Sequence, residues 1–343
     1  MRFYFLHPFI HSVKDAEKYM KVPVPEDVVW DANMPELLFV SEWIYYKRCY
    51  FKEFKRLWGK AKVRVFYAGE AIEPDYNLFD YTIGFNERLN YDDRYIRLPS
   101  PLDFFSNFIN TKINDMLSED DARRELERKK GFCSFLYSNP DAHPMRDRLF
   151  YEISKYKRVD SIGKHLNNVK QNGTGYVGHA AEGVNLKARY KFSIASENAS
   201  FDGYTSEKIF TSLLAHTVPI YWGNRLIKED VNPQSFIHVR DFESLEKLRE
   251  YIEYIDSNDD VWVQMVTQPW MTSEQICKHE LRTNTYREKL IGLFKGDIEL
   301  KTRLPHGTHV DFYRTHFFKS VYPLQLNRLN YKKYLKKIIE KLL

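Results

Sequence analysis

The sequence predicts a doubly wound α/β fold arranged as two domains. Short apolar runs alternate with helical stretches along most of the chain, which is typical of parallel sheets flanked by helices. Residues 191–222 read as a strand, a polar loop, a helix and a second strand in direct succession, which is half of a doubly wound sheet. With 343 residues, the chain is long enough for two domains that each have a core.

The first half of the chain contains several strand candidates. Residues 1–10 are apolar but short and lack a basic lead-in, so we expect a buried first strand instead of a signal peptide. Residues 63–68 and 81–85 predict two further strands. The highly charged segment 118–130 has almost no apolar face and predicts a solvated helix or linker, so we place the domain boundary there. The expected parts are an N-terminal domain of residues 1–125, a C-terminal domain of residues 126–304 and a tail of residues 305–343.

The second half shows a regular alternation of strands and helices. Residues 131–137 predict a strand, and residues 145–156 predict the helix that follows it. A nearly continuous apolar strand at 191–195 leads through a polar loop to a helix at about 205–215, and 218–222 form the next strand. Ligands of such sheets lie beyond the carboxyl ends of the strands, so the loops after these strands are the first place to look for a site.

Composition excludes several classes of protein. Hydrophobic residues make up 43% and charged residues 29%, as in folded soluble proteins, and no apolar run approaches the roughly 20 residues of a membrane span. Three widely separated cysteines without metal-ligand spacing indicate reduced thiols in a cytoplasmic protein. Residues 327–343 contain six basic residues and one acidic residue, which accounts for the whole net charge of +5. The body is therefore formally neutral, and we expect no nucleic-acid partner.

Candidate binding residues gather in the loop and helix after residue 195. Glu197 and Asn198 end the buried strand, and Glu207 and Lys208 fall in the first turn of the next helix. That turn leaves backbone N–H groups without helical partners and favours an anion, to which a lysine adds a positive charge suited to phosphate. Glu207 can accept hydrogen bonds from ribose hydroxyls. From spacing alone, a capped helix with a surface Glu and Lys is the favoured reading.

The residues SENASFDGYTSEKIF, followed by the strand VPIYWG, resemble the signature of the α-1,3/4-fucosyltransferases, glycosyltransferase family 10. Two more blocks agree in order: FCSFLYSNP with the segment 142–146, and FYAGE with DYNLFDYTIGF. The resemblance covers about residues 63–255. It implies a GT-B architecture, in which two Rossmann-like domains face each other across a cleft, followed here by an amphipathic helical tail.

The resemblance also implies roles for individual residues. Arg146 and Lys208 correspond to the cations that bind the diphosphate, Glu207 to the ribose contact, and Glu70 to the proposed general base. An ion pair between Arg146 and Asp147 is the alternative for that arginine. The full set expected to bind GDP-fucose is Ser138, Asn139, Arg146, Glu197, Asn198, Tyr204, Glu207, Lys208 and Tyr221.

The implied reaction is transfer of L-fucose from GDP-fucose, with inversion, to the 3-hydroxyl of N-acetylglucosamine in N-acetyllactosamine-type glycans. The expected product is of the Lewis x type. No Asp-x-Asp tripeptide occurs in the chain, and fixed cations already face the phosphates, so we expect no metal and no other cofactor. α-1,4 transfer, a GT-B transferase with another nucleotide sugar, and a non-catalytic glycan-binding protein remain as alternatives.

The tail at residues 327–343 carries an apolar stripe at helical spacing, and lysines cover much of the remainder. A basic amphipathic helix of this kind suits an anionic membrane surface, where lipid-linked glycan acceptors are built. The other reading is that the stripe docks on the protein's own N-terminal domain. The sequence does not choose between the two.

Overall fold

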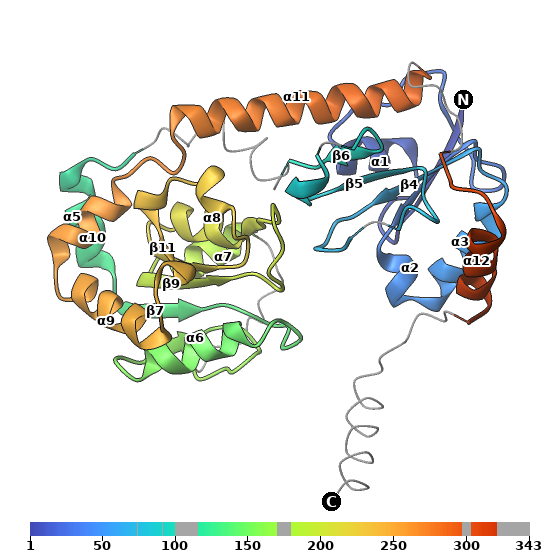
Figure 1. The fold of residues 1–343 in the computed structure, drawn as a ribbon. Coiled ribbons are helices and arrows are strands. Elements are labelled where there is room, and N and C mark those ends of the chain that lie inside the picture. The colour runs from blue at the N-terminus through green and yellow to red at the C-terminus, as the bar shows by residue number, and fades with distance from the viewer. Residues whose placement is uncertain (74, 91, 100–115, 170–179, 297–302, 321–343) are drawn as a thin grey trace, which may run out of the picture. The chain divides into compact units, whose positions relative to one another are not determined.

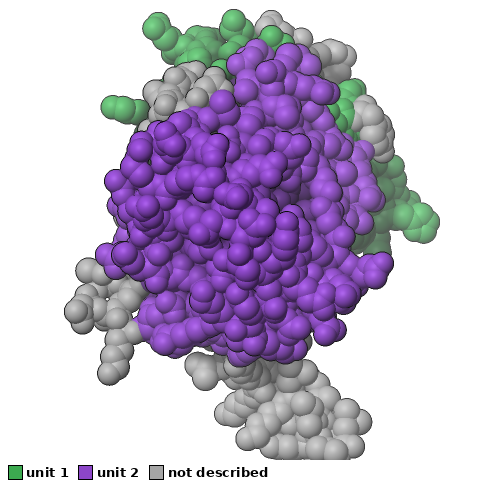
Figure 2. Space-filling view, turned by 90° about the vertical axis from the view of Figure 1, so that its left-hand side faces the viewer, with its two compact units in different colours: residues 1–84, 89–97, 285–343 green, residues 85–88, 98–284 purple. Residues whose placement is uncertain are grey.

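The computed structural model describes residues 1–73, 75–90, 92–99, 116–169, 180–296 and 303–320. The chain divides into two compact units, which Figure 2 colours green and purple: unit 1 comprises residues 1–84, 89–97 and 285–343, and unit 2 comprises residues 85–88 and 98–284. Helix α11 (Ser273–Lys295) begins in unit 2 and ends in unit 1. The limits expected from sequence, 1–125 and 126–304, do not contain this return of the chain to unit 1, and they stay a prediction.

Unit 1 is built on a six-stranded sheet in the order β2-β1-β3-β4-β5-β6, in which every neighbouring pair is parallel. The strands are β1 (Arg2–Leu6), β2 (Val29–Trp30), β3 (Leu37–Ser41), β4 (Val63–Tyr67), β5 (Tyr81–Gly84) and β6 (Tyr95–Arg97). Because the strands are parallel, their carboxyl ends share one edge of the sheet. The residues after β1, β3 and β4 therefore become neighbours.

Helices pack on the sheet of unit 1 through aromatic side chains. Phe54 of helix α3 stacks on Phe79 at 5.3 Å, and Phe317 of helix α12 joins the same buried cluster. Phe294, in the C-terminal part of α11, packs against Phe3 and Phe39 of the sheet. The helices of this unit are α1 (Val13–Met20), α2 (Trp43–Tyr46), α3 (Arg48–Trp58) and α12 (Thr308–Ser320). A 3₁₀ turn at Glu87–Leu89 lies where the chain passes from unit 2 to unit 1.

Unit 2 contains a five-stranded parallel sheet in the order β11-β10-β9-β7-β8. The strands are β7 (Gly131–Phe135), β8 (Val159–Ser161), β9 (Tyr190–Ser196), β10 (Val218–Trp222) and β11 (Ile237–His238). Its helices are α5 (Glu119–Arg128), α6 (Met145–Ser154), α7 (Ala180–Lys187), α8 (Glu207–Leu214), α9 (Leu245–Asp256), α10 (Asp259–Val266) and the start of α11. Short 3₁₀ turns lie at Ile227–Glu229, Pro233–Ser235 and Val239–Asp241.

Helices cover both faces of this second sheet, as Figure 1 shows for α6 on one side and α8 on the other. Helices α6, α9 and α10 enclose one buried cluster with β7, β9 and β10. Helix α8 forms a second cluster with Ala195 and Tyr221, whose side chains leave the opposite face of the sheet. Two-sided burial explains why these strands are apolar at almost every position.

The predicted fold class, α/β with two Rossmann-like parallel sheets, is confirmed, and each strand and helix expected in the second half is present. Segment 118–130 forms a helix, one of the two outcomes expected for it, and most of its residues are exposed. In this helix, α5, Ala122 is fully buried against the core of unit 2, with Leu126 packed beside it. The segment therefore belongs to unit 2 and is not a linker.

The structure leaves the two readings of the tail open, because residues 327–343 lie outside the described residues. Among the described residues, no helix is both long enough and apolar enough to cross a membrane.

Candidate active site

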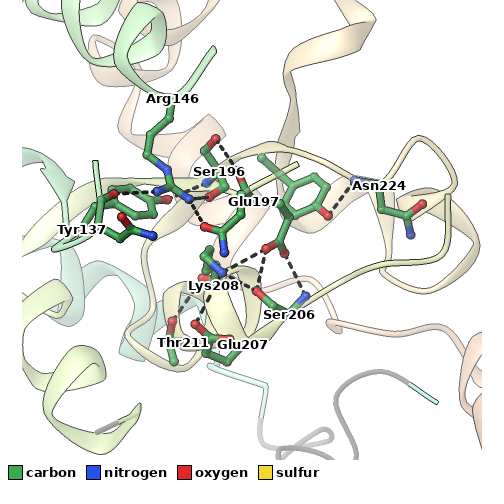
Figure 3. Close-up of polar contacts among 12 residues, drawn as sticks. Tyr137, Arg146, Ser196, Glu197, Ser206, Glu207, Lys208, Thr211 and Asn224 are labelled. Carbon is green, nitrogen blue, oxygen red and sulfur yellow. Dashed lines mark hydrogen bonds and ion pairs between the residues drawn. The ribbon is translucent and has the colours of Figure 1, made fainter. Parts of the chain in front are cut away.

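Polar side chains converge where the strands of unit 2 end. The loops after β7 and β9 and the residues after β10 lie at the same edge of the sheet because the strands are parallel. Figure 3 shows the side chains from these loops and from the first turn of α8 pointing toward one another. Of the residues expected to bind the donor, the structure brings Arg146, Glu197, Asn198 and Lys208 into one connected network.

Arg146 is a buried guanidinium that has no acidic partner among the residues that the structure describes. It lies in the first turn of α6, and its side chain is only 1% exposed. Its Nη2 donates to the Ser196 carbonyl at 3.0 Å and to Asn198 Oδ1 at 2.7 Å, while Nη1 donates to the Asn139 carbonyl at 3.3 Å.

The charge of Arg146 is held by neutral groups only. The guanidinium carbon lies 4.0 Å from the centre of the Tyr137 ring, and the buried Nε has no hydrogen-bond partner among the described residues. Asp147 pairs instead with His165 at 2.7 Å, so the alternative ion pair between Arg146 and Asp147 does not form. A buried positive charge with an unused donor is a site prepared for an anion.

Glu197 fastens Lys208 to the start of α8. It is fully buried, and its two oxygens accept from the Ser206 N–H at 2.8 Å, the Ser206 hydroxyl at 2.7 Å and Lys208 Nζ at 3.1 Å. Burial disfavours the charged ammonium of Lys208, but Glu197 and Glu207 outweigh it and raise the pKa of that lysine. Glu197 thus holds the lysine in place, and its own oxygens are occupied.

The turn after β10 makes room for Glu197. A Cβ atom on Gly223 would lie 2.4 Å from Glu197 Cγ, so only glycine fits here. Tyr221 is also fully buried, and its hydroxyl accepts from the Asn224 N–H at 3.1 Å. Tyr221 thus supports the loop from the core, and its contact with the donor stays a prediction.

The N-terminus of α8 has no side-chain cap. Ser206 occupies the N-cap position, but its hydroxyl makes no capping hydrogen bond; it donates to Glu197 and accepts from Lys208 Nζ at 2.8 Å. Glu207 follows as the first helical residue, and about half of its side chain is exposed. Burial opposes the ionised carboxyl, yet Lys208 and Lys187 prevail and lower the pKa of Glu207. An ionised, accessible carboxylate here fits the predicted ribose contact.

The other expected donor residues lie around this network. Ser138 and Asn139 are exposed in the loop after β7, and the Asn139 carbonyl contacts Arg146. Asn198 is partly buried; its side-chain oxygen accepts from Arg146, and its carbonyl accepts from the His143 N–H at 2.8 Å. Tyr204 is 5% exposed, and its ring packs edge-on against Phe85 at 5.0 Å.

A different set of groups lies at the strand ends of unit 1. Glu70, the expected base, is partly exposed in the turn after β4. Glu42, which directly follows β3, accepts a hydrogen bond from the Gly69 N–H at 3.1 Å and is only 6% exposed. Burial, together with the charge of Glu70, raises the pKa of Glu42. Two carboxylates thus meet beside Gly69.

Sequence reasoning missed three residues of these sites: Tyr137, Lys187 and Glu42. Tyr137 supports Arg146, and its hydroxyl bridges β7 to β9 by donating to the Ile194 carbonyl and accepting from the Ser196 N–H. Lys187 contacts the first turn of α8 from helix α7. Glu42 alone carried a signal in the sequence, since it follows a run of five buried strand residues. No group of three His, Cys, Asp or Glu residues in the described part of the chain is arranged to hold a metal ion.

Comparison with known families gives two matches. The model of the glycosyltransferase family 10 (fucosyltransferase) C-terminal region matches residues 126–291. The model of the α-(1,3)-fucosyltransferase FucT N-terminal domain matches residues 39–104. The two matches together include every residue of both sets described above.

Curated relatives agree with these matches. The chain is 30% identical to the α-(1,3)-fucosyltransferase FucT of Helicobacter pylori over 268 residues, which cover 70% of this chain and 53% of that protein. It is 36% identical to α-(1,3)-fucosyltransferase 4 of Bos taurus over 140 residues, or 40% of this chain and 33% of that protein. The chain thus spans about half or less of the length of these relatives.

Solved structures show the same fold. A crystal structure of an α1,3-fucosyltransferase superposes with a TM-score of 0.63 at 24% identity, covering 84% of this chain and 90% of that one. A crystal structure of an α1,3-fucosyltransferase with GDP-fucose gives a TM-score of 0.60 at 24% identity, with the same coverage. These likenesses concern the fold.

Proposed function

The chain belongs to glycosyltransferase family 10, and on that premise we propose that it transfers L-fucose from GDP-fucose to a glycan acceptor. The observation that carries this proposal is the uncompensated guanidinium of Arg146 beside Lys208 and the uncapped N-terminus of α8. These groups suit a diphosphate, which accumulates negative charge as it leaves the sugar.

In this proposal, unit 2 binds the donor and unit 1 supplies the base. Arg146 and Lys208 bind the diphosphate, Glu207 accepts from the ribose hydroxyls, and Glu197 keeps Lys208 in position. Ser138, Asn139, Asn198 and Tyr204 surround the donor, and Tyr221 supports the loop from the core.

The chemical step is a single displacement. Glu70 accepts the proton of the acceptor hydroxyl. At the same time the acceptor oxygen forms a bond to the anomeric carbon of fucose, and the bond between that carbon and the GDP oxygen breaks. The transition state resembles an oxocarbenium ion, and attack opposite the leaving group converts the β-linked donor to an α-linked product. General-base assistance of this kind contributes about 10²–10⁴ in rate.

For the acceptor, we propose the 3-hydroxyl of N-acetylglucosamine in an N-acetyllactosamine-type glycan, giving a Lewis x-type product. Support comes from the α-(1,3) linkage in the names of the relatives from Helicobacter pylori and Bos taurus. An α-1,4 linkage is the competing outcome. We also propose that the reaction needs no metal, because two fixed cations and a helix N-terminus already face the diphosphate position.

The test is product formation from GDP-fucose with two acceptors in separate reactions: N-acetyllactosamine, whose N-acetylglucosamine has a free 3-hydroxyl, and its β-1,3-linked isomer, whose N-acetylglucosamine has a free 4-hydroxyl. Each reaction is run with and without EDTA, and the linkage is determined by NMR. We expect an α-1,3-linked product at an undiminished rate in EDTA. An α-1,4 product would overturn the linkage, loss of activity in EDTA would overturn metal independence, and transfer only from a UDP-sugar would overturn the donor.

A further inference from the structure

Lys187, the last residue of α7, is a buried lysine directly beneath the start of α8. Its side chain is almost fully enclosed, at 5% exposure. Nζ donates to Thr211 Oγ1 at 2.7 Å, to Ser212 Oγ at 3.1 Å and to the Lys208 carbonyl at 3.2 Å. All three acceptors belong to α8, so Lys187 fixes the turn that presents Lys208 and the helix N-terminus.

The ammonium of Lys187 lacks a direct counterion. All three of its hydrogen-bond acceptors are neutral, and no carboxylate in the described part of the chain lies within 4.0 Å of Nζ. The charged groups that face it are Glu207 and Lys208 from α8 and Glu197 from the end of β9. Burial without an ion pair lowers the pKa of Lys187 to about 7, against the weaker opposing effect of the two carboxylates.

The protonation of Lys187 sets the net charge of the donor-site groups around the start of α8. Arg146 and Lys208 are cationic, and Glu197 and Glu207 are anionic, so these four groups cancel. A protonated Lys187 gives the cluster one net positive charge, and a neutral Lys187 leaves it at zero. The diphosphate of the donor carries negative charge, so the site with a protonated Lys187 attracts it more strongly than the site with a neutral Lys187.

We propose that Lys187 is a positioning residue of the donor site and that its charge controls donor affinity. Lys187 then takes up a proton when GDP-fucose binds. The inference rests on the proposed function, since it assigns the anion at α8 to the donor diphosphate. Lys187 acts through the turn of α8 and through its charge, without touching the donor itself.

The direction of the pH effect follows from linkage. A bound diphosphate favours the protonated lysine, so the pKa of Lys187 is higher in the complex than in the free protein. Donor affinity is then highest below about pH 7 and falls as pH rises between the two pKa values. Each unit of difference between the two pKa values weakens binding by about tenfold across that range.

The experiment is calorimetric titration of the full chain with GDP-fucose at several values between about pH 6 and 8.5, in buffers of different ionisation enthalpy. GDP is avoided because its terminal phosphate titrates in the same range. The unmodified protein is expected to take up a fraction of a proton and to lose about tenfold in affinity toward high pH. Lys187→Met and Lys187→Gln should bind weakly throughout, with the pH dependence and the proton uptake removed.

Lys129 provides a matched control in the same unit. Its side chain is 1% exposed, and Nζ binds the Ala188 and Ala215 carbonyls at the ends of α7 and α8, but it also pairs with Glu125 at 2.9 Å. Lys129→Met removes a buried lysine that follows α5 and contacts the ends of the same two helices, and it should keep the pH dependence of the parent.

Three results would overturn the inference. A Lys187→Met protein that keeps the parental pH dependence contradicts it, as does a parent that binds the donor without proton uptake; both leave the proposed function standing. Failure of the unmodified chain to bind GDP-fucose at any pH overturns the inference and the proposed function together.

Discussion

The strand ends of the two units hold different sets of ionisable groups. In unit 2, Arg146, Lys208 and Lys187 gather at the loops after β7 and β9, and each is held by several hydrogen bonds. In unit 1, Glu42 and Glu70 meet after β3 and β4 beside a neutral environment. The same type of parallel sheet thus carries cations together with carboxylates in unit 2 and two neighbouring carboxylates in unit 1.

The difference lies in how each charge is compensated. Glu42 has no ion-pair partner among the described residues, and His7 at the same edge stays neutral because burial lowers its pKa to about 4. In unit 2, carboxylates neutralise Lys208 but leave Arg146 and Lys187 unpaired. The carboxylates of unit 1 can therefore accept a proton, and the cations of unit 2 can bind a phosphate.

The largest expected effect comes from removing the base. Glu70→Gln should lower turnover by about 10²–10⁴ and leave GDP-fucose affinity unchanged, because the amide cannot accept the acceptor's proton. Steady-state rates and donor titration measure the two quantities separately. Glu73→Gln, an exposed neighbour three residues on, should behave like the parent. Normal turnover in Glu70→Gln would remove this residue from the role of base.

A substitution at Gly223 can weaken the contacts that hold Lys208 without removing a charged residue. In Gly223→Ala, the new Cβ would lie 2.4 Å from Glu197 Cγ, so Glu197 must shift away from Ser206 and Lys208. We expect a loss of about 1–3 kcal/mol in the free energy of unfolding, measured by denaturant titration, together with weaker donor binding.

Gly59→Ala provides the comparison for this variant, because a Cβ there meets nothing within 4 Å. It should unfold at nearly the parental denaturant concentration. Equal stability of Gly223→Ala and the parent would mean that Glu197 is not held as tightly as its contacts indicate.

The smallest expected effect concerns Glu42 and the pH dependence of the protein's stability. The pKa of Glu42 is raised in the folded protein, so its ionisation costs stability as pH rises above the unfolded pKa. Glu42→Gln cannot ionise and should gain melting temperature relative to the parent as pH increases from about 4 to 8, while it keeps an acceptor for the Gly69 N–H. A difference in melting temperature that does not change with pH would place Glu42 in a solvated environment instead.

The sequence predicts this arrangement where it depends on local pattern. The apolar run before Glu197 and the polar loop before Glu207 place both residues at a strand end and a helix start, and α8 begins as expected. Arg146 follows from a helix start after an apolar strand, and the family resemblance supplied its role.

What sequence did not predict depends on packing between distant segments. Lys187 matters only because α7 lies against α8, and no local pattern states which helix its side chain will contact. The full burial of Glu197 requires Gly223 from the next strand, so a residue expected at the donor becomes the support of Lys208. The solvated helix expected at 118–130 is present, but no local pattern indicated that Ala122 and Leu126 pack against the core of unit 2.

The central claim is that the unpaired guanidinium of Arg146 binds the donor diphosphate, and direct titration of Arg146→Ala with GDP-fucose tests it. Arg148→Ala is the matched control, because Arg148 is exposed on the same helix two residues away. Loss of charge-assisted hydrogen bonds worth about 2–3 kcal/mol should weaken the binding of Arg146→Ala about 30- to 150-fold, with Arg148→Ala unchanged. A folded Arg146→Ala protein that binds GDP-fucose as tightly as the parent would contradict the account.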